Sequence, residues 1–386
     1  MIRFFDMFSG IGGFRAGLER AGGFTCVGHC EINKHADKAY RAAHDVKEKE
    51  VFYEDATKID TNTMPDFDLL CGGFPCQSFS IAGKRKGFED ARGTLFFEIA
   101  RVARAKRPAY LLLENVPGLL SHDGGRTFAA ILGTLDELGY HVEWQVLNSK
   151  DFGVPQSRRR VYIVGYLDPR CAGEILPLRE ANAEALKLLI DGRQDSRVYD
   201  PAGVSKTLLA KAGSIGGKTG LYAVGFDRKT GITKGIDAAY TLTAGDYRGL
   251  NRNPTQNAVL YVKGATKRGY NEATAGDSVN LSFAGSNQQR GRVGRKIAHT
   301  ITTGSHQGVV TEDFRIRRLM PRECFRLQGF SETQIDKFLS VDSDAQAYKQ
   351  AGNAVTANVV HVLGLRLKAA HEAVVGATGA GMEAAA

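Results

Sequence analysis

Short apolar runs alternate with amphipathic stretches over residues 1–165, and this alternation constrains the fold more than any other feature of the chain. Such alternation is typical of an α/β fold in which helices connect parallel strands. The expected strands are Ile2–Phe8, Thr25–Ile32, Asp68–Phe74, Ala109–Glu114, His141–Leu147 and Arg160–Tyr166. The expected helices are Gly13–Ala21, Leu95–Lys106 and Arg126–Leu138. We therefore expect an α/β domain over residues 1–166.

The chain has 386 residues, enough for a full core and for two domains. Its start lacks the basic and apolar segments of a signal peptide, and no apolar run approaches a membrane-spanning length. We expect a cytoplasmic protein. Its six cysteines should then be reduced thiols, and their spacing does not fit a metal site, so no metal is expected.

The composition changes in residues 201–310, which hold 15 Lys and Arg against 5 Asp and Glu. The net charge of the whole chain is +9, so the rest is nearly neutral. A basic, glycine-rich segment without helical periodicity predicts short strands, long loops and a polyanion as partner. Thr207-Leu208, Thr241-Leu242 and Thr300-Ile301 form a weak repeat within it.

The remaining segments complete the expected domain organisation. Residues 167–200 should form a connector with one helix, Arg179–Ile190, and residues 201–344 a second domain. Residues 345–386 should return to the first domain as a helix followed by a disordered tail. The expected C-terminal helices are Pro321–Gln328 and Asn353–Val375, and the frayed tail is Gly376–Ala386.

The turn after the first strand, Phe8-Ser9-Gly10-Ile11-Gly12-Gly13, suits close approach of the backbone to a ligand. Its spacing differs from the G-x-G-x-x-G that holds a pyrophosphate. Glu31, at the end of the second strand, could accept both hydroxyls of a ribose, and Asp55 could accept from an adenine amino group. Together these residues favour S-adenosylmethionine over NAD as the cofactor.

Cys76 lies in Gly73-Phe74-Pro75-Cys76-Gln77, directly after an expected strand. A cysteine at a strand end, preceded by proline and followed by polar residues, is a candidate nucleophile if its pKa is lowered. A buried structural cysteine is the alternative for this residue taken alone.

The motifs of the chain resemble those of the bacterial restriction–modification type of DNA (cytosine-5) methyltransferase. They cover residues 1–165 and 315–360 in the order of the family: Phe8-Ser9-Gly10-x-Gly12-Gly13, Gly73-Phe74-Pro75-Cys76-Gln77, Arg92-Gly93-Thr94-Leu95, Glu114-Asn115-Val116, Gln156-x-Arg158-x-Arg160, Arg318-x-x-Pro321-Arg322-Glu323-Cys324 and Gln350-x-Gly352-Asn353-Ala354-Val355. The resemblance implies a Rossmann-like catalytic domain, dependent on S-adenosylmethionine, with a smaller strand- and loop-rich target-recognition domain. Residues 201–310 match only as the variable stretch.

The resemblance also implies the chemistry. Cys76 would add to carbon 6 of a flipped-out cytosine, so that carbon 5 can accept the methyl group. Glu114 would contact ring nitrogen 3 and the exocyclic amine, Arg160 the carbonyl oxygen, and Arg158 would support the site. Phe8 would stack on the adenine with Leu95 on its other side, and Asn353 would hold the nucleophile loop or the target sugar.

The complete set of expected site residues is larger. The expected cofactor contacts are Phe8, Ser9, Gly10, Gly12, Glu31, Ile32, Asp55, Ala56, Pro75, Leu95, Asn353, Ala354 and Val355. The expected DNA contacts are Gln77, Ser80, Lys84, Arg92, Thr241, Arg248, Arg252, Arg290 and Arg292. Residues 83–88, with glycines at positions 83 and 87, suggest a lid that closes over DNA.

Several alternatives stay open from the sequence. A tRNA cytosine-5 methyltransferase and a catalytically silent DNA-binding regulator are the rival functions, whereas the motif of amino-group DNA methylases is absent. The Thr-Leu-type pair beside the flipped base has three candidates, of which Thr241 is preferred here. The expected partner is double-stranded DNA, with a cognate restriction endonuclease acting in the same system without direct contact. We expect a monomer.

Overall fold

The computed structural model describes residues 1–74, 95–176, 178, 188–190, 198–199, 223–227, 232–236, 260–263, 270–280, 293–303, 307–311 and 316–383. Two compact units divide the chain. Unit 1 comprises Met1–Leu178, His299–Ser305 and Leu319–Ala386, and unit 2 comprises Arg179–Ala298 and His306–Arg318. Within the described ranges, no helix combines the length and the hydropathy that crossing a membrane requires.

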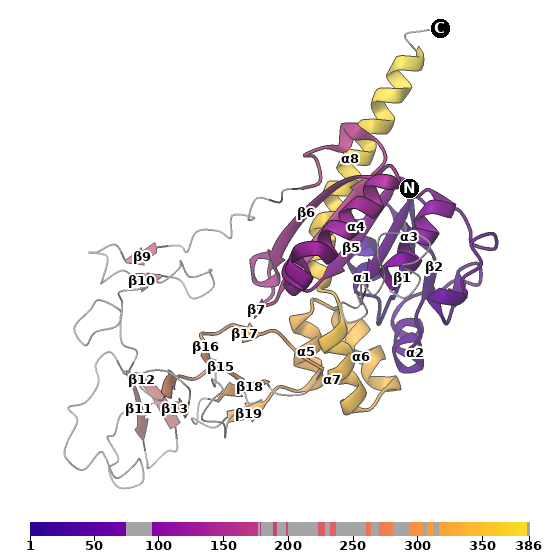
Figure 1. Cartoon of the computed structure of the whole chain (residues 1–386). Helices are drawn as coiled ribbons and strands as arrows, with labels where there is room; N and C mark the ends of the chain where they lie inside the picture. The colour runs from indigo at the N-terminus through magenta and orange to yellow at the C-terminus, as the bar shows by residue number, and fades with distance from the viewer. Residues whose placement is uncertain are drawn as a thin grey trace. The chain divides into compact units, whose positions relative to one another are not determined.

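Unit 1 is built on a seven-stranded sheet in the order β3-β2-β1-β4-β5-β8-β6 (Figure 1). Strands β1 to β5 run parallel, whereas β8 is antiparallel to both β5 and β6. The sheet is therefore mixed rather than wholly parallel as the sequence suggested. The strands are β1 (Ile2–Met7), β2 (Phe24–Cys30), β3 (Val51–Tyr53), β4 (Leu69–Gly73), β5 (Tyr110–Asn115), β6 (His141–Asn148) and β8 (Arg159–Tyr166).

Helices cover both faces of this sheet. The α-helices are α1 (Gly13–Ala21), α2 (Lys34–Ala43), α3 (Leu95–Lys106), α4 (Arg126–Glu137), α5 (Pro321–Leu327), α6 (Glu332–Val341), α7 (Asp344–Asn353) and α8 (Ala357–Glu383). Short 3-10 helices are η1 (Ala56–Lys58), η3 (Pro117–Gly125), η4 (Ser149–Phe152) and η5 (Pro169–Cys171). The expected strands and helices of residues 1–166 are confirmed to within two residues at each end.

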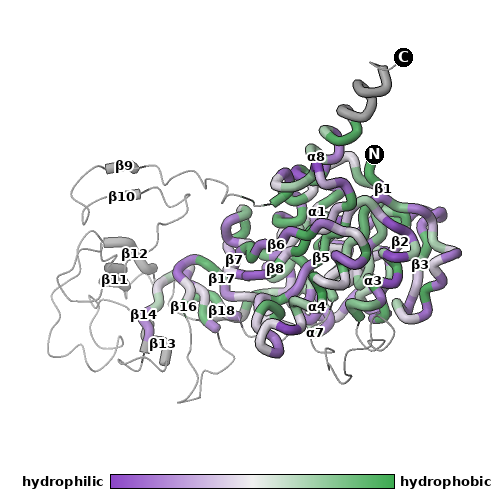
Figure 2. Tube along the Cα trace, turned by 45° about the horizontal axis from the view of Figure 1, so that its top comes forward, coloured by the Kyte–Doolittle hydropathy of each residue, from purple (hydrophilic) through white to green (hydrophobic). Residues whose placement is uncertain are grey.

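Two hydrophobic clusters follow from the alternation of side chains along β1. Ile2 and Phe4 pack with α1 and α8 on one face, whereas Phe5 and Met7 pack with α3 and α4 on the other. Figure 1 shows α8 behind the sheet and α4 in front of it, and Figure 2 shows hydrophobic stretches gathered in the strands and helices of unit 1. The result is a three-layer sandwich with the sheet in the middle.

The C-terminal helices differ from the expectation. The predicted helix Asn353–Val375 is wrong at its start, because α7 ends at Asn353 and α8 begins at Ala357. The tail predicted to fray from Gly376 is helical as far as Glu383. The helix expected over residues 179–190 lies largely outside the described residues, but its last three residues form β9 (Leu188–Ile190).

Unit 2 contains short strands, as its composition indicated. Two hairpins pair β11 (Ala223–Asp227) with β12 (Ile232–Ile236) and β13 (Leu260–Lys263) with β14 (Tyr270–Ala273). A four-stranded sheet has the order β16-β15-β18-β19. Its strands are β15 (Ser278–Asn280), β16 (Val293–Gly294), β18 (Gln307–Val310) and β19 (Ile316–Arg318). Of the other short strands, β10 (Val198–Tyr199) belongs to unit 2 and β7 (Gln156–Ser157) to unit 1, while β17 (Ala298–His299) spans the boundary between the two in the sequence. Residues 319–344, which we expected in the second domain, are assigned to unit 1.

Candidate active site

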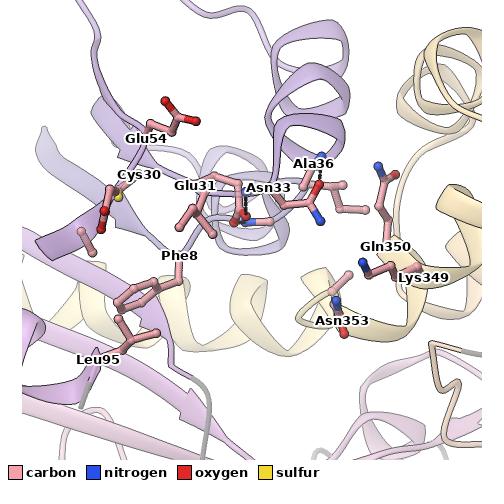
Figure 3. A pocket seen from close by; sticks show the side chains of 16 residues that line it. Phe8, Cys30, Glu31, Asn33, Ala36, Glu54, Leu95, Lys349, Gln350 and Asn353 are labelled. Carbon is pink, nitrogen blue, oxygen red and sulfur yellow. Dashed lines mark hydrogen bonds between the residues drawn. The ribbon is translucent and has the colours of Figure 1, made fainter. Parts of the chain in front are cut away.

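A cavity of about 310 Å³ lies in unit 1, beside the carboxyl ends of β1, β2 and β3. Ligands of open α/β sheets bind at this edge, outside the carboxyl ends of the strands. Figure 3 shows side chains from these strand ends, from α2 and α3 and from α7 around one space. The lining residues are Phe8, Gly10, Ile11, Cys30, Glu31, Ile32, Asn33, Ala36, Glu54, Asp55, Ala56, Leu95, Lys349, Gln350, Asn353 and Ala354.

The turn between β1 and α1 brings backbone to the pocket through three left-handed residues. Phe8 has φ 57°, Gly10 has φ 55° and Gly12 has φ 84°. A non-glycine residue such as Phe8 is uncommon in this region and needs support from its surroundings. That support includes the Ser9 N–H, which donates to the Cys30 carbonyl over 3.0 Å and ties the turn to β2. The strained turn thereby presents the Phe8 side chain to the pocket.

Glu31 is held rigidly at the end of β2. Its two carboxylate oxygens accept the N–H groups of Gly10 and Asn33, each over 2.8 Å. Burial raises the pKa of Glu31, while these two hydrogen bonds favour its charged form. Each carboxylate oxygen can accept more than one hydrogen bond, so the group can still receive two ligand hydroxyls.

Asp55 begins the next strand–helix connection. Its Oδ1 accepts from the N–H and the hydroxyl of Thr57, and these bonds lower the pKa of Asp55. Oδ2 is 3.5 Å from the amine of Lys58. The charged carboxylate lies beside the apolar side chains of Phe8, Leu95 and Ile32, which is 69% exposed. An aromatic ring that carries an amino group fits this combination of flat apolar contacts and a hydrogen-bond acceptor.

His44 supports the glycine turn from beneath and was not predicted from the sequence. Its Nε2 lies 3.1 Å from the Ile11 carbonyl oxygen, which can only accept, so Nε2 carries the proton. A Cβ at Gly12 would lie 2.2 Å from the same Nε2. Arg15 of α1 holds the segment after His44 through the Asp45 carbonyl and a buried ion pair with Glu50.

Glu114 and Arg160 form an ion pair at the ends of β5 and β8. Arg160 Nε is 3.0 Å from Glu114 Oε1, and both side chains are nearly buried. Burial raises the pKa of Glu114, and the charges of Arg160 and Arg158 oppose that rise. Glu114 pairs in register with Gly73 at the end of β4, from which the chain continues to Phe74 and to Cys76. The Asn115 amide donates to the Phe74 carbonyl over 2.7 Å and fixes the start of that continuation.

Arg158 is 3% exposed and contacts backbone rather than an open site. Its guanidinium donates to the carbonyls of Ile301, Gly352 and Ala354 over 2.9 to 3.1 Å. Burial lowers its pKa to about 10, so the group stays charged at neutral pH. The last two of these carbonyls end α7 and adjoin the pocket, so Arg158 holds the pocket wall.

The same stretch of chain holds residues 300 and 301. The Thr300 hydroxyl donates to the Ser157 carbonyl over 2.9 Å, and the Ile301 N–H donates to Gln156 Oε1 over 2.9 Å. The short segment His299–Ser305 belongs to unit 1, although unit 2 residues precede and follow it. It is therefore bound to β7 (Gln156–Ser157), which directly precedes Arg158 in the sequence.

The structure brings together most of the expected cofactor residues. Those that line the pocket are Phe8, Gly10, Glu31, Ile32, Asp55, Ala56, Leu95, Asn353 and Ala354. Three others, Ser9, Gly12 and Val355, support the pocket without lining it: Ser9 and Val355 are buried, and the backbone of Val355 lies against Gly13. Asn353 ends α7 rather than opening the last helix.

Other expected residues lie outside the described ranges, namely Pro75, Cys76, Gln77, Ser80, Lys84, Arg92, Thr241, Arg248, Arg252, Arg290 and Arg292, as does the stretch 83–88. The sequence reasoning missed Ile11, Cys30, Asn33, Ala36, Glu54, Lys349 and Gln350. Most of these residues are sequence neighbours of a predicted residue, and Gln350 belongs to a motif already noted. Proximity in the sequence to a predicted residue was therefore the one signal that could have identified them. No group of three or more His, Cys, Asp or Glu side chains within the described ranges could hold a metal ion.

Comparisons with known proteins identify the family of the chain. A family model described as C-5 cytosine-specific DNA methylase matches residues 2–369. The orphan methyltransferase M.SPRI of Bacillus phage SPR is 34% identical, with 93% of this chain and 95% of the relative covered. The type II methyltransferase M.HhaI of Haemophilus parahaemolyticus is 32% identical, with coverage of 94% and 93%. The solved structure of the Entamoeba histolytica methyltransferase EhMeth is similar in fold, with a TM-score of 0.51, 18% identity and coverage of 95% and 98%.

The chain belongs to the C-5 cytosine-specific DNA methylase family. Within that class it is a DNA (cytosine-5) methyltransferase, of the kind found in restriction–modification systems or as an orphan methylase.

Proposed function

We propose that the pocket of unit 1 binds S-adenosylmethionine and that Cys76 is the nucleophile that activates the target cytosine. The family implies this cofactor, and the residues present fit it. The fixed carboxylate of Glu31 suits the ribose hydroxyls, and Asp55 suits the adenine amino group beside Phe8 and Leu95. The bound cofactor supplies an electrophilic methyl group on a sulfonium.

The other cysteines support the assignment of Cys76. The cysteines at positions 26, 30, 71, 171 and 324 are buried. Burial raises the pKa of Cys26 and Cys30 to about 12 and also raises that of Cys71, so these thiols stay protonated at neutral pH. A nucleophile must be a thiolate. Cys76 is three residues after Gly73, a span of at most about 11 Å, and Gly73 pairs with Glu114.

The Glu114–Arg160 pair is the single observation that carries the mechanism. When the Cys76 thiolate bonds to carbon 6, electron density moves into the ring, and a proton held by Glu114 at ring nitrogen 3 offsets it. Arg160 keeps this carboxyl in place and would donate to the carbonyl oxygen of the base. Carbon 5 would then accept the methyl group that the cofactor, held by Glu31 and Asp55, would supply. Transfer of the carbon 5 proton to solvent water would finally expel Cys76 as a thiolate, and return of the nitrogen 3 proton to Glu114 would restore the ring.

We further propose that unit 2 reads the target in double-stranded DNA and that the enzyme acts as a monomer on one flipped base at a time. Its basic composition supports phosphate contacts, with Arg248, Arg252, Arg290 and Arg292 as candidates. A cognate restriction endonuclease would act on the same sequence without contact. Of the three Thr-containing pairs, Thr300-Ile301 replaces Thr241 as our candidate beside the base. Its attachment to Gln156 and Ser157, which closely precede Arg158 and Arg160 in the sequence, supports this choice.

The test is base-resolution cytosine methylation sequencing of DNA from a methylation-free host that expresses the protein, beside a Cys76→Ser variant. Methylcytosine confined to one short motif and absent with the variant is the expected result. Methylation that persists with Cys76→Ser would reject the nucleophile. Absence of DNA methylation with the soluble wild-type protein would direct the assay to labelled-methyl transfer onto tRNA.

A further inference from the structure

Charges are distributed unevenly around the pocket. Three carboxylates, Glu31, Glu54 and Asp55, line it, and Lys349 is the one cationic side chain among the described residues that do so. In Figure 3, Phe8 and Leu95 lie on one side, Glu31 in the middle, and Lys349 with Asn353 on the other. The Lys349 amine points toward the middle of the pocket (Figure 3). An elongated ligand would thus meet apolar side chains, then a carboxylate, then an ammonium group.

This order matches the parts of the proposed cofactor. Adenine suits the side of Phe8 and Leu95, and the ribose hydroxyls suit Glu31, so the amino-acid end must extend toward Lys349. That end carries the only anionic group of S-adenosylmethionine, a carboxylate, which the three acids of the pocket would repel. We propose that Lys349 binds this carboxylate. The inference rests on the proposed function, because it assumes the same cofactor in the same pocket.

The turn of α7 that carries Lys349 is fixed in place. The side-chain amide of Gln350 donates to the His35 carbonyl over 3.2 Å and to Asp342 Oδ2 over 2.7 Å. The carbonyls that end α7 are held by Arg158. Lys349 itself is exposed and forms no ion pair with a described residue, so its charge is available to a ligand.

Isothermal titration calorimetry with two product analogues tests the proposal. S-adenosylhomocysteine has the carboxylate, and its decarboxylated analogue, an amine, lacks it. Lys349→Met should weaken S-adenosylhomocysteine about fivefold, the size of one exposed ion pair, and leave the affinity for the decarboxylated analogue unchanged. Lys349→Arg should restore wild-type affinity. Lys337→Met, an exposed lysine of α6 away from the pocket, is the matched control and should change neither affinity.

Two results would overturn the role of Lys349. Equal weakening of both analogues would indicate a general effect on the pocket. Unchanged S-adenosylhomocysteine affinity, with or without a raised KM for DNA, would show that Lys349 does not bind the carboxylate of the cofactor. If the wild-type protein binds neither analogue, the proposed function itself fails, so the two failures are distinguishable.

Discussion

Glu114 shows how much of the chemistry depends on the environment of one side chain. An ordinary glutamate is deprotonated at neutral pH and cannot donate a proton to a base. At the end of β5, burial raises the pKa of Glu114. Arg160 Nε lies 3.0 Å from its carboxylate, fixes the orientation of the group and, by favouring the charged form, limits the rise in pKa. The residue therefore retains a protonated fraction at higher pH than an exposed glutamate would.

We predict that Glu114→Gln lowers kcat by about 10²- to 10⁴-fold, the usual contribution of a positioned acid. In the wild-type enzyme, kcat should fall as pH rises through the raised pKa of Glu114, because the protonated form is then lost. That decline should be absent in the variant, whose amide does not titrate. Single-turnover rates across pH measure both effects.

A matched control is Glu98→Gln, on α3 and paired with Arg101 away from the pocket. It should keep both the wild-type rate and the wild-type pH profile. If kcat of Glu114→Gln still fell as pH rises, the titrating group would be a residue other than Glu114.

Individual site residues were predictable where a local signal exists. Phe8, Glu31 and Asp55 follow strand ends, and the structure places all three at one pocket. Arg158 was expected at the site, but its three bonds go to carbonyls far away in sequence. The role of His44 could not be predicted, because a single histidine after a helix belongs to no local sequence pattern and only the fold brings it next to Gly12.

Among the elements, the turn from β1 into α1 depends on a steric fit between two residues. Gly12 has φ 84°, which costs a side-chain-bearing residue about 1–2 kcal/mol, and His44 fills the space where a Cβ would project. His44 also donates to the carbonyl of Ile11, which lines the pocket. The fit predicts energetic coupling between the two positions.

Gly12→Ala should destabilise the protein and weaken S-adenosylhomocysteine binding, and His44→Ala should do the same more mildly. The double variant should lose less than the sum of the two, with a coupling of about 0.5–3 kcal/mol, because removing the imidazole relieves the overlap. Urea unfolding and calorimetry measure the cycle. Strict additivity would show that His44 does not occupy the space into which a Cβ at position 12 would project.

The packing of α1 against α8 also requires a glycine, but because the two helices approach closely rather than because of its φ angle. A Cβ at Gly17 would lie 2.5 Å from Val360 Cβ and 2.7 Å from the Ala357 carbonyl oxygen. Gly17→Ala should therefore cost about 1–3 kcal/mol of unfolding free energy, although alanine favours helices.

Gly133 of α4 provides the comparison, because a Cβ there would meet nothing within 4 Å. Gly133→Ala should stabilise by about 0.5–1 kcal/mol. Urea denaturation of both variants should give opposite signs. A neutral Gly17→Ala would mean that the two helices separate at little cost.

Periodicity located α1, α3 and α4, because each pairs an apolar stripe with a turn signal, but α2 was not predicted. It could not locate the break between α7 and α8. The carbonyls of Gly352 and Ala354 accept hydrogen bonds from Arg158, which lies between β7 and β8 and is distant in sequence, rather than from the next helical turn. Tertiary contacts of this kind decide helix ends without leaving a local pattern. The antiparallel direction of β8 was equally hidden, since strand composition does not encode direction.

At the scale of the whole molecule, two units carry different charges and different proposed tasks. The excess of basic residues lies in residues 201–310, most of which belong to unit 2, whereas the pocket lies in unit 1. Phosphate contacts release counterions, so DNA affinity should fall steeply with salt, but binding of a small zwitterion should not.

We predict that replacing any one of Arg248, Arg252, Arg290 or Arg292 by Gln lowers the slope of log K for DNA against log salt by about 1 if that residue contacts a phosphate. Affinity for S-adenosylhomocysteine should stay unchanged. Fluorescence anisotropy with labelled duplex DNA across salt concentrations gives the slopes. Arg366→Gln, on α8 in unit 1, is the control; unchanged slopes in all four variants would remove these arginines from the interface.

The short segment His299–Ser305 has a consequence for how target specificity can be inherited. Because it belongs to unit 1 while unit 2 precedes and follows it, unit 2 is encoded as two separate blocks, Arg179–Ala298 and His306–Arg318. A recombination event that exchanges only the longer block leaves Thr300 and Ile301 attached to Ser157 and Gln156 of their own unit 1. It also joins a foreign set of strands to the native β18, which pairs with β15 from the exchanged block on one side and with β19 on the other. Exchange of specificity between relatives should therefore succeed when both blocks travel together and the seven residues between them stay with the catalytic unit.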